Sequence, residues 1–318
     1  EDQDMKTRLS FIILFTLSVI TFPVETRAIL SAWVAEVVDE GRSIDWDSYR
    51  DTNAMAIDSV GNPRIVYGGS HLYLARYNGS DWAHEIVDPE LGAGSYPSIA
   101  VDTNDDIHIV YLAGGDSSYP DLKYATNASG TWAIEVLDDT SQGVFKGTSI
   151  AVDASGGVHI GYRRNVVGQD GYGLIYLTNA SGSWISETIP DSELPPSIEG
   201  RGTSLVLDSQ GYVHMGYNFV DATDSVRPAH ATNRSGSWSW EVIDGDSNRY
   251  LTDSAPSIAI DSSGVVHVSY GIGDWSSGIE VIHANNEGGV WTRETACSFS
   301  SGGVSNTSIG IGSSDSLH

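Results

Sequence analysis

The feature that most constrains the fold of this chain is an internal repeat of about 50 residues. Each copy joins a β-rich stretch such as SIAVDTNDDIHIVY to a second one such as LKYATNASGTWAIEVLD, with a variable segment between them. Equivalent markers are 44 to 55 residues apart, a spacing typical of propeller blades and longer than the coils of a short solenoid. The markers are an aspartate, at Asp58, Asp102, Asp153, Asp208 and Asp261, and a tryptophan, at Trp82, Trp132, Trp184, Trp238 and Trp291.

Each copy predicts four β-strands in one order. A strand such as SIAVD is followed by a D-x-x-G turn, a strand such as VHIGY, a variable loop, a third strand such as LKYATN, an N-x-S-G turn and a last strand W-x-x-E-x-I-D. Gly, Asn, Asp and Ser suit tight hairpins, and Val, Ile, Tyr and Trp suit the strands beside them. The first two strands are apolar on both faces, which indicates sheets pressed between neighbours. The predicted fold is all-β: a β-propeller of four-stranded antiparallel blades, with five complete repeats plus a split or truncated sixth.

The two ends of the repeat region carry complementary fragments. The segment Trp33–Asp39 has the sequence of a fourth strand with no strands before it, and Thr307–His318 begins a sixth copy. If the first fragment joins the last blade, the ring closes and no sheet edge stays exposed. We therefore expect a single propeller domain over residues 29–318, truncated at its C-terminal side.

The first 28 residues have the pattern of an export signal. Met5 and Lys6 begin a positively charged start, an apolar run covers residues 9–22, and Thr26–Ala28 suits cleavage. The apolar run is too short for a transmembrane helix, so we expect no stable membrane span. Glu1–Asp4 are interpreted as upstream readthrough. The prediction is a protein that is secreted, extracellular or at the cell surface.

Composition restricts the partners further. The chain has 42 acidic and 16 basic residues and a formal net charge of −26, which repels phosphate backbones and anionic membranes. We expect no nucleic-acid partner and a monomeric protein. Cys297 is the single cysteine of the chain, so no intrachain disulfide is possible and packing has to supply the stability.

One histidine recurs in the second strand of the copies and has Arg64 in its place in the first. Residues copied into every blade serve the blade, so we interpret these histidines as buried groups bonded to a nearby acid or hydroxyl rather than as metal ligands. They are His108, His159, His214, His267 and His318. The segment Asp244–Asn248 has alternating oxygen ligands that calcium accepts, but a polar turn explains it as well, and we expect no cofactor.

The third-to-fourth turns resemble the blade-closing hairpins of secreted propellers of the broad sialidase/BNR-repeat-like class. TNASGTW and TNASGSW are similar to that class's motif S-x-D-x-G-x-T-W, although they are one residue shorter and lack its aspartate. The resemblance implies a propeller fold over residues 33–318. For sialidases it implies three arginines holding a carboxylate and a nucleophilic tyrosine. Arg64, in the string PRIV, lies where the other copies have histidine.

The variable loops predict where a ligand binds. In a four-stranded meander, the second-to-third loop and the connection to the next blade share one edge, and loops on a rigid scaffold are where recognition usually occurs. Aromatic rings stack on sugar faces, and charged groups bond the hydroxyls. The candidate ligand-binding residues are Trp46, Tyr49, Arg50, Tyr119, Asp121, Arg163, Arg164, Tyr172, Arg201, Arg249, Tyr250 and Trp275.

Three functional hypotheses remain open. The first is an exported binding module that recognises a carbohydrate or a surface partner through the variable-loop face. The second is a polysaccharide-active enzyme, either a sialidase-like glycoside hydrolase or a polysaccharide lyase, using Arg163 or Arg164 with a tyrosine. The third is a structural surface propeller. The sequence contains no Walker motif, zinc-ligand pattern or G-x-S-x-G elbow, and no catalytic residue is assigned.

Overall fold

The computed structural model contains β-sheets and one short 3₁₀ helix among the residues that it describes. These residues are 12–15, 34–39, 54–114, 120–139, 147–165, 172–189, 202–220, 225–245, 256–274, 278–300, 307–312 and 314–318. No helix in these ranges is long and apolar enough to cross a membrane.

Five four-stranded antiparallel sheets follow one another along the chain, and we number them blade 1 to blade 5. Blade 1 contains β3 (Met55–Ile57), β4 (Pro63–Tyr67), β5 (Leu72–Tyr77) and β6 (Trp82–Asp88). Blade 2 contains β7 (Ser95–Val101), β8 (Ile107–Ala113), β9 (Asp121–Thr126) and β10 (Ala133–Asp138). Blade 3 contains β11 (Ser149–Val152), β12 (Val158–Asn165), β13 (Tyr172–Thr178) and β14 (Ile185–Thr188).

The last two blades repeat this arrangement. Blade 4 contains β15 (Thr203–Leu207), β16 (Val213–Val220), β17 (Val226–Thr232) and β18 (Ser239–Val242). Blade 5 contains β19 (Ser257–Ile260), β20 (Val266–Asp274), β21 (Gly278–Asn285), the 3₁₀ helix η1 (Glu287–Gly289) and β22 (Thr292–Phe299). Near the N-terminus, β1 (Ile12–Phe15) and β2 (Val34–Val37) form a separate two-stranded sheet.

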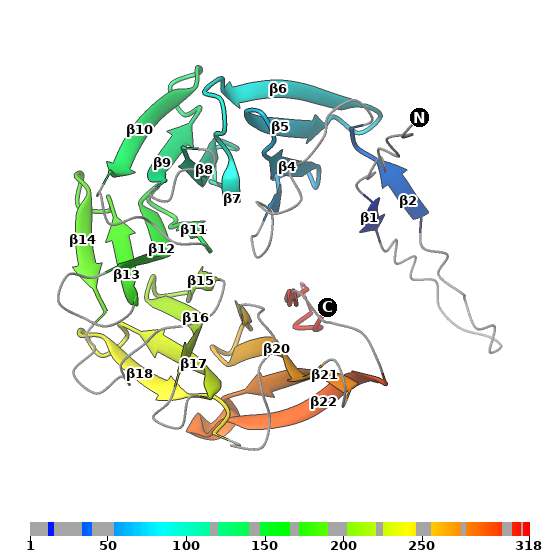
Figure 1. Ribbon diagram of the computed structural model, residues 1–318, viewed down its shortest axis with the longest axis vertical. Coiled ribbons are helices and arrows are strands. Elements are labelled where there is room, and N and C mark those ends of the chain that lie inside the picture. Colours follow the sequence, from blue (N-terminus) through cyan, green and yellow to red (C-terminus); the bar gives the residue numbers. More distant parts are fainter. Residues whose placement is uncertain are drawn as a thin grey trace, which may run out of the picture.

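The five blades surround a common centre, with their first strands innermost and their fourth strands outermost (Figure 1). No complete sheet occupies the sector between blade 5 and blade 1, where β1, β2 and the C-terminal residues lie. The predicted all-β propeller with five complete four-stranded repeats is therefore confirmed.

The core lies between neighbouring blades. One apolar cluster joins Val66 and Leu74 of blade 1 to Ile99 and Ile109 of blade 2, and the other boundaries between consecutive blades have equivalent clusters. The second strands of blades 2 and 4 are buried along their whole length in this way, which explains why they are apolar on both faces. In the first strand of blade 1, by contrast, Met55 and Ile57 are 47% and 49% exposed. Burial of the apolar surface between blades supplies the main free energy of folding.

The repeated aspartate closes the first hairpin of each blade. In blade 3, Asp153 Oδ1 accepts hydrogen bonds from the backbone N–H of Ser155 at 2.7 Å and of Gly157 at 2.9 Å. Gly156 lies between them with a φ of 84°, a conformation that glycine adopts without steric cost. In blade 2, Asp105 takes this position with a φ of 64°.

The repeated asparagine ties the second hairpin back to the second strand. Asn127 Oδ1 accepts a hydrogen bond from the backbone N–H of Ile107 at 2.7 Å, and Asn179 makes the same bond to Val158 at 2.8 Å. A hydrogen-bonding role in the turn therefore accounts for the recurrence of this residue.

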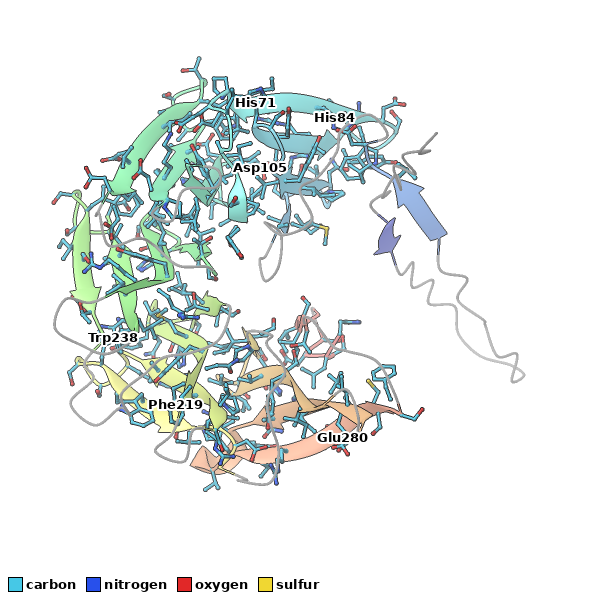
Figure 2. All side chains as sticks on the ribbon, viewed as in Figure 1. His71, His84, Asp105, Phe219, Trp238 and Glu280 are labelled. Carbon is cyan, nitrogen blue, oxygen red and sulfur yellow. The ribbon has the colours of Figure 1, made fainter. Side chains whose placement is uncertain are left out.

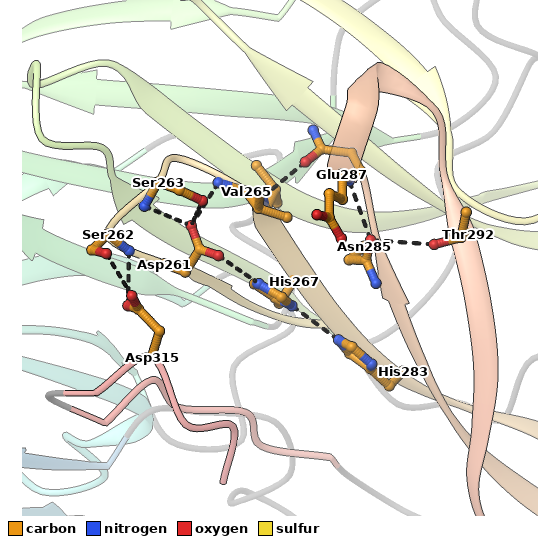
Figure 3. Close-up of polar contacts among 12 residues, drawn as sticks. Asp261, Ser262, Ser263, Val265, His267, His283, Asn285, Glu287, Thr292 and Asp315 are labelled. Atoms are coloured by element: carbon orange, nitrogen blue, oxygen red, sulfur yellow. Dashed lines mark hydrogen bonds and ion pairs between the residues drawn. The ribbon is translucent and has the colours of Figure 1, made fainter.

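The prediction of buried histidines in polar chains is confirmed for His108, His159 and His214. His267 is partly buried, and the prediction is wrong for His318, which is exposed and lies 3.0 Å from Ser316 Oγ. His159 Nε2 lies 3.2 Å from Asp153, and its Nδ1 lies 2.6 Å from the hydroxyl of Tyr176. In blade 5 a second histidine replaces the tyrosine, so that His267 contacts both Asp261 and His283 (Figure 3). In blade 1, Arg64 pairs with Asp58 in place of a histidine.

Candidate functional site

A tyrosine and an aspartate join neighbouring blades at the variable edge. The Tyr111 hydroxyl, in blade 2, donates a hydrogen bond of 2.6 Å to Asp88, which ends the fourth strand of blade 1. The same bond joins Tyr162 to Asp138 at 2.8 Å and Tyr270 to Asp244 at 3.0 Å. We call these contacts the blade clamps. Because they repeat, they are part of the scaffold.

A cation lies beside most of these aspartates. Lys123 Nζ is 3.3 Å from Asp88, Arg164 is 3.0 Å from Asp138, and Arg293 pairs with Asp244. Burial alone would raise the pKa of Asp88, but hydrogen bonds from Tyr111 and the Glu90 backbone, together with the charge of Lys123, hold it below its ordinary value. Both members of the Asp88–Lys123 pair are therefore charged at neutral pH.

Blades 1 and 2 depart from the repeat in their third strands. Tyr67 of blade 1 makes the same kind of bond as the clamp tyrosines, to Asp39 at 2.7 Å. Tyr73 lies directly opposite Tyr67, and Lys123 lies directly opposite Tyr111. The equivalent positions in blades 3, 4 and 5 are Ile175, Ala229 and Ile282. Tyr73 packs on the side of blade 1 that carries Val38, whereas Lys123 packs against Asp88 of blade 1. Residues that serve every blade equally do not explain these two positions, so the variable edge of blades 1 and 2 is the best candidate site among the described residues.

Further polar groups surround Tyr73. Its hydroxyl lies 2.9 Å from Ser70 Oγ, its ring stacks on Tyr67 with centroids 5.5 Å apart, and the ring of His71 meets it edge-on at 6.0 Å. Figure 2 shows His71 on blade 1. Ser70, His71, Tyr73, Glu90 and Lys123 are called the junction cluster below.

Backbone and side-chain contacts connect Ser70 and His71 of the junction cluster to the segment that contains Glu90. The Gly92 N–H donates to the Ser70 carbonyl at 3.0 Å, and His71 Nδ1 lies 3.2 Å from the Glu90 carbonyl. Lys123 also pairs with Glu90, whose side chain is 48% exposed. The cluster thus combines a hydroxyl, a phenol, an imidazole, a carboxylate and an ammonium group, which together can donate to and accept from sugar hydroxyls.

Four of the sequence-predicted ligand residues lie within the described part of the chain. Asp121 begins β9, and Tyr172 begins β13 opposite Asn165. Arg163 and Arg164 lie on β12 opposite Leu174 and Gly173. Arg163 is only 4% exposed, and Arg164 serves the clamp of Asp138. The other candidates lie outside the described residues: Trp46, Tyr49, Arg50, Tyr119, Arg201, Arg249, Tyr250 and Trp275.

Sequence reasoning missed the junction cluster because it searched the long loops, whereas Tyr73 and Lys123 lie within the third strands. The available signal was the repeat itself. An alignment of the third strands shows Tyr73 and Lys123 where later copies have aliphatic residues.

The described residues contain no group of three or more potential metal ligands. Asp244, the first residue of the segment considered for calcium, serves a blade clamp, and Asp246–Asn248 lie outside the described residues.

No protein-family model matches the chain, and no curated protein matches it. Among solved structures, an ulvan lyase bound to GlcA(1-4)Rha3S aligns with 77% of this chain and 69% of its own, at 14% identity and a TM-score of 0.52. A thermostable family-43 glycoside hydrolase aligns with 80% of this chain and 94% of its own, at 13% identity and a TM-score of 0.48.

A fucose lectin from Kordia zhangzhouensis, solved with methyl-fucoside, aligns with 46% of this chain and 96% of its own, at 18% identity and a TM-score of 0.33. Identities below 20% support a comparison of fold alone. Of these three structures, only the ulvan lyase has a TM-score above 0.5, so only it supports the fold. The chain therefore has the β-propeller type of fold found in a solved polysaccharide lyase.

Proposed function

We propose that this protein is an exported β-propeller that binds a carbohydrate at its variable edge, with the junction cluster as part of the contact surface. The observation that carries the proposal is the asymmetric pair Tyr73 and Lys123, each opposite a repeated clamp tyrosine. The half-buried His71 and the exposed Glu90 carboxylate add polar groups at the same edge. Tyr73 and Lys123 are themselves only 6% and 8% exposed, so they would support His71 and Glu90 from beneath rather than stack on a sugar face.

The charge of the protein favours uncharged sugars. A net charge of −26 repels sulfates and uronates at long range. The clamp cations Lys123, Arg164 and Arg293 each lie beside an aspartate of the preceding blade, which satisfies their charge locally. We therefore expect a neutral glycan to bind more tightly than a sulfated or uronic one of similar backbone.

The experiment is affinity electrophoresis of the full chain through a panel of neutral polysaccharides and their sulfated counterparts, followed by titration calorimetry with the best binder. A neutral glycan should retard the protein, and His71→Ala and Tyr73→Phe should weaken binding by about three- to tenfold. Tyr176→Phe is the matched control, because it removes a buried hydroxyl from blade 3. The proposal fails if no polysaccharide retards the protein, or if Tyr73→Phe binds as tightly as the unsubstituted chain.

A polysaccharide-active enzyme is the second candidate, because His71 and Tyr73 bring an imidazole and a phenol together at one edge. Both groups are able to transfer protons. Release of reducing ends or of an unsaturated product absorbing near 232 nm, abolished by His71→Ala, would identify turnover. Binding without either product would assign the protein as a binding module.

A further inference from the structure

The C-terminal segment docks on blade 5 as the first strand of another blade would. The Ile309 backbone N–H donates to Ser257 Oγ at 3.2 Å, which repeats the bonds from Leu205 to Ser149 and from Ile258 to Ser204. These serines each begin the first strand of their own blade or lie next to its start.

A second contact repeats two residues further toward the N-terminus. Thr307 Oγ1 donates to the Ser269 carbonyl at 2.9 Å, as Thr203 does to the Gly161 carbonyl at 3.2 Å. Thr307 and Thr203 occupy equivalent positions in their repeats, and so do Ser269 and Gly161. The segment therefore has the register of an inner strand.

The same segment turns back as the first hairpin of a blade. Gly310 and His318 exchange backbone hydrogen bonds of 2.9 and 3.0 Å. Asp315, with a φ of 57°, accepts bonds from both the N–H and the hydroxyl of Ser262 on blade 5 (Figure 3). Asp105 makes the same two bonds to Ser59 of blade 1. His318 thus occupies the position of the repeated histidine.

The N-terminal segment docks on blade 1 as the last strand of a preceding blade would. The Tyr67 hydroxyl donates to Asp39 at 2.7 Å, which is the blade clamp that Tyr111 makes with Asp88. Val38, the residue before Asp39, is 7% exposed and packs in the cluster that contains Tyr67. Val87, the residue before Asp88, is buried in the same way.

We infer that residues 34–39 and 307–318 belong to one composite sixth blade, in which these two segments associate between blade 5 and blade 1. Both segments lie in the same sector, between blade 5 and blade 1 (Figure 1). The interaction surface on each side is a strand of the repeat, and its partner is the other segment of the same chain.

The composite blade also supports the junction cluster. Asp39 holds the hydroxyl of Tyr67, and Tyr67 carries Tyr73 on its ring face. Asp39 is therefore a positioning residue for this edge, supplied by the composite blade. The inference about the sixth blade stands on the docking contacts and does not depend on what the edge binds.

Hydrogen exchange in the full chain tests whether the two ends form one unit. Tyr67→Phe removes the clamp hydroxyl at the N-terminal side, and the readout is exchange of the Ile309, Gly310 and His318 amides at the other side. In a composite blade these amides should exchange several-fold faster than in the unsubstituted protein. Tyr162→Phe, which removes the equivalent hydroxyl between blades 2 and 3, should leave them unchanged.

The reciprocal experiment changes an exposed residue of blade 5 that contacts the C-terminal segment and measures hydrogen exchange at the N-terminal segment. Ser262→Ala removes the hydroxyl bond to Asp315, and the amides of residues 34–39 should then exchange faster. Ser59→Ala is the control, because it removes the same bond between blades 1 and 2 and should leave exchange of residues 34–39 unchanged. If neither Tyr67→Phe nor Ser262→Ala affects the opposite end, the two segments dock on their blades independently, and the composite blade is wrong.

Discussion

The hydroxyl of Tyr111 bonds to Asp88 across the boundary between two blades, and both groups are more than nine-tenths buried. Burial and the hydrogen bond to the Asp88 carboxylate raise the pKa of Tyr111, so the phenol stays protonated and remains a donor. This clamp connects successive sheets rather than strands of one sheet, and it has consequences for stability.

Tyr111→Phe should lower the free energy of unfolding by about 1.5 to 3 kcal/mol, because a buried carboxylate loses a charge-assisted hydrogen bond. Urea unfolding followed by tryptophan fluorescence measures the change. The control is Tyr77→Phe, which keeps the ring packed on Trp82 at a centroid distance of 5.2 Å. Equal stability of both variants would contradict a role for the clamp.

Acidification should destabilise the protein through His214. Burial, with the charge of neighbouring His230, lowers the pKa of His214 to about 4 from an ordinary value of 6.5. Between these values the unfolded chain binds more protons than the folded one, so stability falls as the pH decreases from 6.5 to 4. The loss from this residue reaches about 3 kcal/mol at the acid end.

Unfolding free energies measured between pH 7 and pH 4 test this expectation. His214→Gln keeps a polar side chain but removes the titrating group, so its stability should depend less steeply on pH across this window. An unchanged slope would assign the acid sensitivity to other groups.

Asn127→Ala should cost about 1 to 2 kcal/mol, since it leaves the buried backbone N–H of Ile107 without its side-chain acceptor. Ser129→Ala changes the serine of the same N-x-S turn but keeps the bond between Asn127 and Ile107. The melting temperature of Ser129→Ala should therefore be nearly unchanged. The opposite order of melting temperatures would show that the turn needs the serine more than the asparagine.

Blade 1 offers a test by reconstruction. Arg64 replaces the repeated histidine, and Leu74 lies where blades 2 and 3 have the partner tyrosine, so Arg64 bonds the Tyr77 carbonyl at 2.7 Å instead. Arg64→His alone should destabilise the protein because it loses this bond. Adding Leu74→Tyr should recover part of the loss by restoring the histidine–tyrosine contact, as a double-mutant cycle will show. A purely additive cycle would rule out that coupling.

The sheets could be predicted from the sequence because the same strand and turn pattern occurs in five copies. Strands that are apolar on both faces, turn aspartates and turn asparagines each recur, and the structure uses Asp153 and Asn179 as those patterns require. The histidine chains were predictable for the same reason.

The candidate site was harder to predict because it depends on distances across blade boundaries. Arg164 was selected as a ligand residue, yet it neutralises Asp138, which is 26 residues away in the sequence. Conversely, Tyr73 resembles an ordinary strand residue until its register places it opposite Tyr67. Composition and residue spacing do not predict pairwise contacts of this kind.

The blade clamps also bear on how such a ring gains or loses units. Since Tyr111, Tyr162 and Tyr270 each meet an aspartate of the preceding blade, a tandem duplication of one coding unit would bring both halves of a new joint with it. Ring size is then free to drift during evolution, while an asymmetric edge such as that of blades 1 and 2 has to be kept in a single copy.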